Sequence, residues 1–291
     1  MKNSNRYCVD EPSQLLEYLF TILSERSRNS VKTLLARGQV SVDGQPETAF
    51  NYKLQKGQMV EVGHNRSFKK STPLQGLKIL HEDEDLIIID KSSGLLSVAT
   101  AKEKQSTAYR QLTDHVQNHN PKGRIFIVHR LDRETSGVMM FAKNEKIKHA
   151  LQNNWKNIVR ERTYMALVEG EVQTSEGTIS SWLKESKSMK MHSSQKPNDG
   201  QYAVTHYKRI QWNSSFSLLE VQLETGRKNQ IRVHMEDIGH PIAGDKKYGA
   251  AKKGIGRLGL HAKLLTFQHP STKKLMRFKA ETPEAFFKKS K

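Results

Sequence analysis

The sequence predicts an α+β protein in which a long, mostly antiparallel mixed sheet carries flanking helices, with a small α/β domain before it. Short apolar or alternating runs separated by turn residues recur from residue 77 to the end of the chain. Helical stripes lie between several of these runs. Residues 64–75 are polar and basic and show no periodicity. We therefore expect a domain over residues 1–63, a linker over 64–75 and a second domain over 76–291.

Two helices are expected first. Leu15, Leu19 and Leu23 recur at helical spacing, and Ser13 is placed to cap the start of that helix. A second helix is predicted from about Ser30 to Arg37, because the glycine that follows is a typical helix stop.

A hairpin follows these helices. Residues 40–44 alternate and then turn on Asp43-Gly44, which is a strong hairpin signal. A turn at Lys56-Gly57 precedes another short strand over residues 58–62. The first domain is thus read as helix, helix, hairpin and closing strand.

The second domain alternates strands with helices. Residues 86–89 are apolar and are followed by Asp90, and the run 86–90 is expected to be a strand buried on both faces. Residues 186–200 are polar and rich in Lys, Met and Ser, and are read as a surface loop. The predicted strands cover residues 77–81, 86–90, 138–142, 162–170, 202–207, 216–223 and 260–267, and the predicted helices cover 107–118 and 147–158.

Composition argues against a membrane or disulfide-rich protein. Hydrophobic residues make up 35% of the 291 residues, and the mean hydropathy is −0.70. No apolar run approaches the roughly 20 residues that a membrane-spanning helix needs, and residues 1–10 lack the apolar core of a signal peptide. Cys8 is the only cysteine, which excludes a disulfide framework or a cysteine-based metal site. We expect a cytoplasmic protein that acts as a monomer.

The charge is strongly positive. The formal net charge is +18 at pH 7, and residues 246–291 alone hold 13 Lys and Arg against 2 Asp and Glu. Such an excess favours a polyanionic partner, with nucleic acid first and an anionic membrane second.

One acidic residue stands among cations on a predicted loop. Asp132 lies between Arg130 and Arg133, and the turn formers Thr135-Ser136-Gly137 lead into a buried strand. Nearby positive charge favours the ionised carboxylate. From spacing alone, a structural ion pair and a functional site are about equally good explanations.

The run from His129 to Gly137 resembles the His-Arg-Leu-Asp and Thr-Ser-Gly motif of the RluA-type pseudouridine synthases. That resemblance implies that Asp132 is the catalytic residue. Tyr164, preceded by a basic residue and followed by an apolar strand, matches the second motif of the family, which would make it part of the substrate pocket rather than an ordinary core aromatic.

Residues 225–234 resemble the third family motif, Thr-Gly-Arg-x-His-Gln-Ile-Arg-x-His. By this resemblance we expect Arg227 to hold the carboxylate of Asp132, because a guanidinium can grip a carboxylate bidentately. Ile231 would form an apolar wall beside the tyrosine. Asn229 departs from the pattern, since histidine is usual at that position.

The resemblance implies isomerisation of uridine to pseudouridine within RNA. The uridine must leave its stack, and Tyr164 would stack on the flipped base while Arg130 fills the gap left behind. Asp132 would either add covalently to the sugar or base, or act as a general base. No cofactor or metal is implied, and the twelve histidines show no metal-ligand spacing.

The first domain resembles the S4 RNA-binding domain over about 50 residues. The likeness includes residues 28–30 before the second helix and residues 38–44. It implies that Arg28, Lys32 and Arg37 face RNA, although for each residue taken alone an ordinary solvated helix charge is the favoured interpretation. A unit of this modest charge would act mainly as a second foothold on the RNA.

Other functions explain less of the sequence. A non-catalytic RNA-binding or ribosome-assembly factor would account for the charge but not for an acid among arginines on an RNA-contacting surface. A glycoside hydrolase needs two carboxylates, and no second acid has a matching context. The run from Gly254 to Gly259 formally fits a dinucleotide fingerprint, but no strand precedes it and no helix is predicted after it. By the resemblance to the RluA-type enzymes, the expected substrate is ribosomal RNA of the large subunit, with transfer RNA second.

Overall fold

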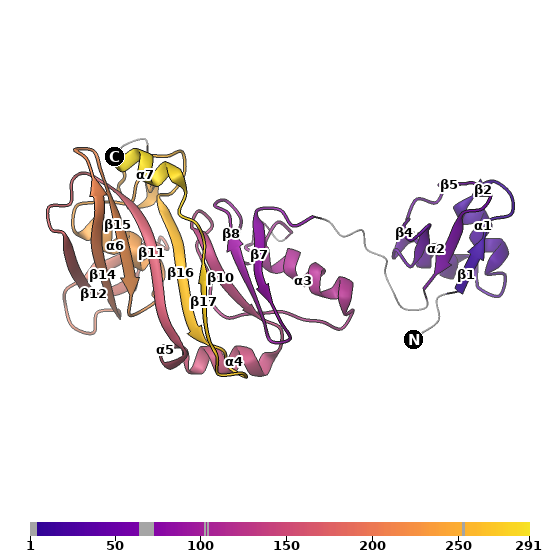
Figure 1. Cartoon of the computed structure of the whole chain (residues 1–291), viewed down its shortest axis with the longest axis horizontal. Helices are drawn as coiled ribbons and strands as arrows, with labels where there is room; N and C mark the ends of the chain where they lie inside the picture. The colour runs from indigo at the N-terminus through magenta and orange to yellow at the C-terminus, as the bar shows by residue number, and fades with distance from the viewer. Residues whose placement is uncertain (1–4, 64–72, 102, 104, 252–253) are drawn as a thin grey trace. The chain divides into compact units, whose positions relative to one another are not determined.

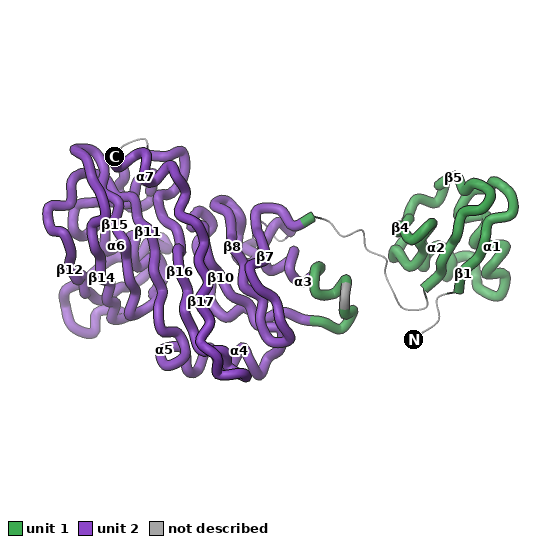
Figure 2. The backbone as a smooth tube through the Cα atoms, viewed as in Figure 1, with its two compact units in different colours: residues 1–73, 114–123 green, residues 74–113, 124–291 purple. Residues whose placement is uncertain are grey.

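The computed structural model of the chain describes residues 5–63, 73–101, 103, 105–251 and 254–291. Figure 2 shows two compact units, residues 1–73 with 114–123 and residues 74–113 with 124–291. Most of the expected linker, residues 64–72, lies outside the described residues. No helix within the described part of the chain is long and apolar enough to cross a membrane.

The N-terminal unit packs two helices on a small antiparallel sheet of order β1-β6-β3-β4. Its core is built from buried aliphatic side chains of both helices and of β3 and β6. Its elements are β1 (Asn5–Cys8), β2 (Ser13–Gln14), α1 (Leu15–Ile22), α2 (Arg28–Ala36), β3 (Val40–Val42), β4 (Gln45–Pro46), β5 (Lys53–Leu54) and β6 (Met59–Val62).

Two details of this unit follow from local chemistry. The hairpin of β3 and β4 turns where predicted, with Asp43 and Gly44 at φ of 50° and 76°, because both turn residues tolerate the left-handed region. The prediction that Ser13 caps α1 is wrong: Ser13 pairs with Leu54 in β2 and β5, and Gln14 precedes the helix without a side-chain cap. The second helix begins at Arg28, two residues before Ser30, because the Ser27 side chain caps it.

The larger unit is an α+β structure around a mixed sheet of 11 strands, as predicted (Figure 1). The strand order is β13-β12-β14-β15-β11-β16-β10-β8-β7, with β17 paired to β16 and β9 to β10. Only β10 and β16 pair in parallel among the described strands. The strands are β7 (Leu77–Glu82), β8 (Leu86–Lys91), β9 (Phe126–Ile127), β10 (Ser136–Ala142), β11 (Val159–Glu169), β12 (Glu176–Glu185), β13 (Met191–Ser194), β14 (Gln201–Trp212), β15 (Phe216–Leu223), β16 (Leu260–Gln268) and β17 (Leu275–Lys279). The helices are α3 (Ala108–His119), α4 (Glu145–Asn153), α5 (Trp155–Ile158), α6 (Gln230–Asp237), the 3-10 turn η1 (Lys246–Tyr248) and α7 (Glu284–Ser290).

The helices cover both faces of this sheet. Strand alternation sends Ala166 and Val168 of β11 to the face that packs on α6. It sends Met165 and Leu167 to the opposite face, which packs on Phe286 of α7. Tyr164 therefore lies on the α6 face, the face that carries the candidate site.

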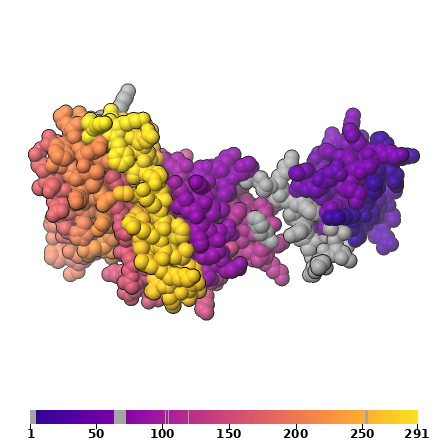
Figure 3. Space-filling model, in the orientation of Figure 1, coloured from indigo at the N-terminus to yellow at the C-terminus, as the bar shows by residue number. Residues whose placement is uncertain are grey.

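The hairpin of β16 and β17 also contacts the turn between β7 and β8. His269 Nε2 lies 3.2 Å from Asp83 Oδ2, and Ser271 Oγ donates to Asp85 at 2.5 Å. Figure 3 shows the C-terminal segment, in yellow, lying against the surface of these purple strands.

Two predictions for this unit need correction. The helix expected over residues 147–158 is broken at Asn154 into α4 and α5. The loop expected over residues 186–200 contains β13, which extends the edge of the sheet by pairing with β12.

Candidate active site

Asp132 lies on a short loop that the side chain of Lys91 ties to the loop after β8. The fully buried Lys91 donates through Nζ to the carbonyl oxygens of Ser92, Leu95 and Arg133, at 2.9, 2.8 and 3.1 Å. Burial lowers the pKa of Lys91 to about 8. A single ammonium thus ties the loop after β8 to the loop that carries Asp132.

The backbone at position 137 requires glycine. Its φ is +111°, and an added Cβ would lie 2.1 Å from the backbone oxygen of Ala262 in the parallel neighbour β16. Next to it, Ser136 Oγ lies 2.8 Å from His261 Nδ1 and accepts a hydrogen bond from Arg257. The strand after Asp132 therefore enters the sheet at a position where no larger side chain fits.

Within the described part of the chain, the carboxylate of Asp132 has two partners, and both come from the start of α6. Asn229 Nδ2 donates to Oδ2 at 2.7 Å, and Arg232 Nη1 donates to the same oxygen at 3.0 Å. Asn229 and Arg232 are three residues apart, so they project from one face of the helix. Asp132 keeps 31% of its side-chain surface exposed.

Arg227 does not hold this carboxylate, contrary to our expectation. Its Nε donates to the backbone oxygen of Tyr202 at 3.0 Å. Arg227 precedes α6, whereas Arg232 sits in the first turn and reaches Asp132 directly. The guanidinium that pairs with Asp132 is that of Arg232.

Arg232 bridges two carboxylates. Its Nε and Nη2 grip Asp245 at 2.6 and 2.8 Å, and Nη1 reaches Asp132. Burial by itself would lower the pKa of Arg232, but the hydrogen bonds and charges of Asp245 and Asp132 raise it above its ordinary value. Asp245 is 1% exposed. A buried carboxylate therefore anchors the guanidinium that faces Asp132.

A polar chain supports the other partner. The buried Tyr248 hydroxyl donates to Asn229 Oδ1 at 3.1 Å and accepts from the Met191 amide at 3.1 Å. Asn229 has φ of 53°, in the left-handed region that asparagine tolerates better than most residues. With its oxygen bound to Tyr248, the amide of Asn229 directs its nitrogen at Asp132.

The remaining residues predicted for the uridine pocket line one cavity with Asp132. Tyr164 is half-buried there, and burial raises its pKa, so the phenol stays protonated at neutral pH. Ile231 is 4% exposed, whereas Arg130 is exposed. Arg227 lines the same cavity although it does not bind Asp132.

The three cations predicted to face RNA lie in the N-terminal unit. Arg28 and Lys32 are exposed on α2, one turn apart, and Arg37 is exposed at the end of that helix. Arg28 stacks on the Phe20 ring with 5.3 Å from Cζ to the ring centroid. Among the described residues, no group of three or more His, Cys, Asp or Glu side chains could hold a metal ion.

Sequence reasoning missed Arg232, Tyr248, Asp245 and Lys91. The signal for Arg232 was present, because Asn229 and Arg232 have i, i+3 spacing at the start of a helix. Asp245 and Tyr248 had no such local signal, since they reach the site only through the tertiary structure.

Comparison with known proteins identifies the family and the fold. The sequence model of the RNA pseudouridylate synthase family matches residues 85–237. The chain is 34% identical over 265 residues to the uncharacterized RNA pseudouridine synthase YjbO of Bacillus subtilis (strain 168), covering 90% of this chain and 92% of that protein. It is 35% identical over 274 residues to YlyB of the same organism, which carries the same description, with 92% and 90% covered.

A solved structure agrees. Human RNA Pseudouridylate Synthase Domain Containing 4 has 26% identity and a TM-score of 0.59, and the match covers 72% of this chain and 90% of that one. The chain is thus an RNA-modifying enzyme of the isomerase class. It belongs to the RNA pseudouridine synthase family, which confirms the resemblance to the RluA-type enzymes.

Proposed function

We propose that Asp132 is the catalytic carboxylate and that the enzyme modifies uridines of large-subunit ribosomal RNA. The observation that supports the catalytic role is the environment of Asp132. Its Oδ2 accepts from Asn229 and Arg232, while among the described residues Oδ1 accepts no hydrogen bond. One oxygen is fixed and the other is available to a substrate, and Tyr164 lines the same cavity.

The reaction moves the glycosidic bond of the uracil from N1 to C5 without redox chemistry. The bond between C1′ of the ribose and N1 of the uracil breaks, the base turns, and a bond from C5 to C1′ forms. The hydrogen on C5 leaves as a proton and N1 takes up a proton, so no electrons are gained or lost. Oδ1 of Asp132 would assist this exchange at the sugar or the base.

The uridine must be extruded to reach the cavity. Tyr164 would stack on the flipped uracil, and Ile231 would supply the apolar wall behind it. Arg130 is exposed at the cavity, where its guanidinium would occupy the space vacated in the RNA.

Asp132→Asn tests the catalytic role, because it keeps the shape of the side chain and removes its charge. We expect no tritium release from RNA that carries 5-tritiated uridine, with RNA affinity retained. Glu134→Gln is the matched control, since it neutralises an exposed carboxylate two residues away that does not line the cavity. Undiminished turnover by Asp132→Asn would refute the assignment. Absence of tritium release by the wild-type protein would instead favour a non-catalytic RNA-binding role.

We also propose that residues 1–63 form an S4-like foothold for structured RNA. Exposed Arg28, Lys32 and Arg37 support this role. Arg28→Gln with Lys32→Gln should weaken binding to ribosomal RNA fragments. The slope of log affinity against log salt concentration should fall in magnitude by about 2, roughly one for each lost phosphate contact. Adding Arg37→Gln should weaken binding further. The control pair Lys53→Gln and Lys56→Gln, which changes two other exposed lysines of this unit, should leave RNA binding unchanged. Equal effects of the two pairs would indicate non-specific charge attraction.

The choice of RNA is a separate test. Transcripts of large-subunit ribosomal RNA and of transfer RNA can be compared as substrates at equal concentration, and pseudouridines can be mapped in cells that lack the enzyme. We expect ribosomal sites to lose modification. Loss confined to transfer RNA would overturn the proposed target and leave the catalytic proposal intact. We propose that the enzyme works in the cytoplasm as a monomer, and its mass in solution at micromolar concentration tests the second point.

A further inference from the structure

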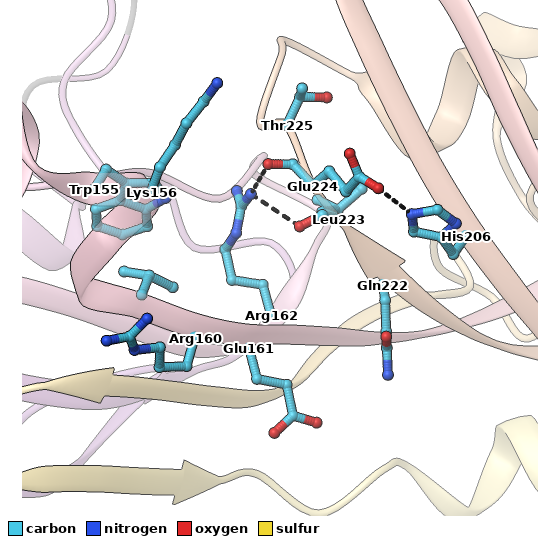
Figure 4. A pocket seen from close by; sticks show the side chains of 11 residues that line it. Trp155, Lys156, Arg160, Glu161, Arg162, His206, Gln222, Leu223, Glu224 and Thr225 are labelled. Atoms are coloured by element: carbon cyan, nitrogen blue, oxygen red, sulfur yellow. Dashed lines mark hydrogen bonds and ion pairs between the residues drawn. The ribbon is translucent and has the colours of Figure 1, made fainter.

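A second hollow lies next to the Asp132 cavity. Its volume is about 460 Å³, against about 80 Å³ for the Asp132 cavity. This volume falls in the range of sites that bind small molecules or single nucleotide-sized groups. Its lining comes from α5, the start of β11, β14 and the end of β15, as Figure 4 shows: Trp155, Lys156, Val159, Arg160, Glu161, Arg162, His206, Gln222, Leu223, Glu224 and Thr225.

The two hollows adjoin on one face of the sheet. Arg162 lines the second hollow and Tyr164 lines the Asp132 cavity. Alternate residues of a strand project from the same face and are about 7 Å apart. Leu223 lines both hollows. A nucleotide beside one held at Tyr164 would therefore reach the second hollow without leaving the protein surface.

Trp155 supplies a fixed aromatic wall. Its half-buried ring packs against the core beside α4 and lies 5.2 Å from the ring of His129, within the motif that carries Asp132. Arg162 Cζ lies 5.9 Å from the Trp155 ring centroid. The Arg162 guanidinium is itself held, because Nη2 donates to the backbone oxygens of Leu223 and Glu224 at 3.0 and 3.1 Å, as Figure 4 shows. An indole supported in this way can stack on a base without being reordered first.

Two cations that line the hollow have no acidic partner in the described structure, whereas both acids that line it accept hydrogen bonds from neighbouring side chains. Lys156 and Arg160 are exposed and form no ion pair among the described residues. Glu224 is bound to His206, with 2.7 Å between Oε1 and Nε2. Glu161 accepts from two threonine hydroxyls at 3.1 and 3.2 Å. The hollow therefore combines an aromatic platform with unpaired positive charge, the combination that binds single-stranded nucleic acid.

We propose that this hollow binds a nucleotide that neighbours the target uridine in the RNA. Its base stacks on Trp155, and its phosphates face Lys156 and Arg160. Gln222 and the bound pair of His206 and Glu224 lie where they offer donors and acceptors to the edge of that base. This inference rests on the proposed function, because the target uridine must occupy the Asp132 cavity for its neighbour to reach Trp155.

Fluorescence of Trp155 tests the contact directly. The chain has three tryptophans, so Trp182→Phe with Trp212→Phe leaves Trp155 as the only one. In an Asp132→Asn background, which prevents turnover, titration with decauridine RNA should quench this fluorescence, since a base would stack on the indole. An unchanged signal at RNA concentrations that saturate binding would overturn the proposal.

Affinity provides a second measurement. Trp155→Ala should weaken binding of decauridine by about fivefold to about 150-fold, because stacking of one base on an aromatic ring contributes about 1–3 kcal/mol. Trp155→Phe should keep most of the affinity. Trp212→Ala is the matched control, since Trp212 is 47% exposed and lies outside the hollow. With substrate RNA, KM should rise more than kcat falls.

Variants of Lys156 and Arg160 test the proposal even if Trp155→Ala fails to fold. Lys156→Gln with Arg160→Gln changes only exposed side chains, and thermal unfolding should confirm an intact fold. The slope of log affinity against log salt should fall by about 1.4, which is about 0.7 for each phosphate contact to a single strand. An unchanged slope would contradict the proposal.

The two proposals fail in different ways. Wild-type affinity in Trp155→Ala and unquenched fluorescence in the protein that retains only Trp155, together with an inactive Asp132→Asn, would remove the second subsite and leave the catalytic assignment standing. Full turnover by Asp132→Asn would remove the catalytic assignment, whatever the Trp155 variants do.

Discussion

Replacing Arg232 by methionine separates the two carboxylates that this guanidinium bridges. The change leaves Asp245, which is 1% exposed, without its charged partner. Removing one partner of a buried ion pair costs about 3–5 kcal/mol. For a unit of this size, that cost lowers the melting temperature by about 6–20 °C, at about 2–4 °C for each kcal/mol.

The same change removes one of the two donors to Asp132. A hydrogen bond between charged groups contributes about 1.5–3 kcal/mol. If it acts on the transition state, its loss lowers kcat/KM by about tenfold to about 150-fold. Arg232→Met with Asp245→Asn separates the two effects, because the neutral amide needs no guanidinium and can still accept from the Lys247 and Tyr248 amides, as Asp245 now does.

We expect the double variant to regain most of the lost melting temperature and none of the lost activity. Differential scanning calorimetry and tritium release from labelled RNA measure the two quantities. Arg227→Met is the control, since among the described residues the Arg227 side chain bonds only the backbone oxygen of Tyr202. Its loss should lower the free energy of unfolding by about 1 kcal/mol or less. The reasoning would be refuted if Arg227→Met lost more activity than Arg232→Met, or if the double variant regained activity along with stability.

Three further predictions follow from the loop and its surroundings. Gly137→Ala should abolish folding of the larger unit or turnover, because its Cβ would meet the Ala262 oxygen at 2.1 Å; a stable, active variant seen by circular dichroism and tritium release would contradict this. Burial lowers the pKa of His261 from 6.5 to about 4. As the pH falls from 6.5 to 4, the unfolded chain therefore binds a proton before the folded chain does, and the free energy of unfolding decreases by up to about 3 kcal/mol. Urea unfolding across that range should show a flatter pH dependence in His261→Asn, and an unchanged one would contradict the burial argument. Tyr164→Phe should keep RNA affinity, because the ring that would stack on uracil remains; a large loss of affinity in a filter-binding assay would argue against stacking.

The sequence was most informative where one local rule decided the structure. The short apolar run of residues 86–89 favoured a strand buried on both faces, and β8 lies in the sheet between β7 and β10. Asp43-Gly44 turns the first hairpin because those two residues adopt positive φ at little cost. The face of Tyr164 was likewise implied by strand alternation, once β11 was placed.

Local rules failed where a tertiary contact outweighed them. Residues 186–200 have no strand periodicity, yet β13 forms because β12 offers an unpaired edge and Tyr248 accepts a hydrogen bond from the Met191 amide. Ser13 is a good capping residue, but it pairs with Leu54 in the sheet, and Gln14 takes the N-cap position without a side-chain cap. In both cases, the deciding partner lies too far along the chain for a short window to include it.

The misassigned guanidinium shows how the start of a helix determines which residue reaches a site. Both Arg227 and Arg232 follow the same Thr-Gly pair, and a guanidinium at either position could have gripped Asp132. The left-handed conformation of Asn229 ends the loop and starts α6 at Gln230. Arg227 therefore belongs to the turn, where the Tyr202 carbonyl binds it, and Arg232 shares a helix face with Asn229. The departure from the family pattern at Asn229 thus lies in the group that directly contacts the proposed catalytic carboxylate.

Histidine at this position would have to donate to Asp132 while losing or replacing the bond that Tyr248 makes to the amide oxygen. Asn229→His should consequently alter the pH dependence of turnover, because it would introduce a titrating group beside Asp132, whereas Asn229→Gln, which does not titrate, should leave the shape of that profile unchanged. Identical pH profiles for Asn229→His and the wild type would show that this contact has no influence on the reacting carboxylate.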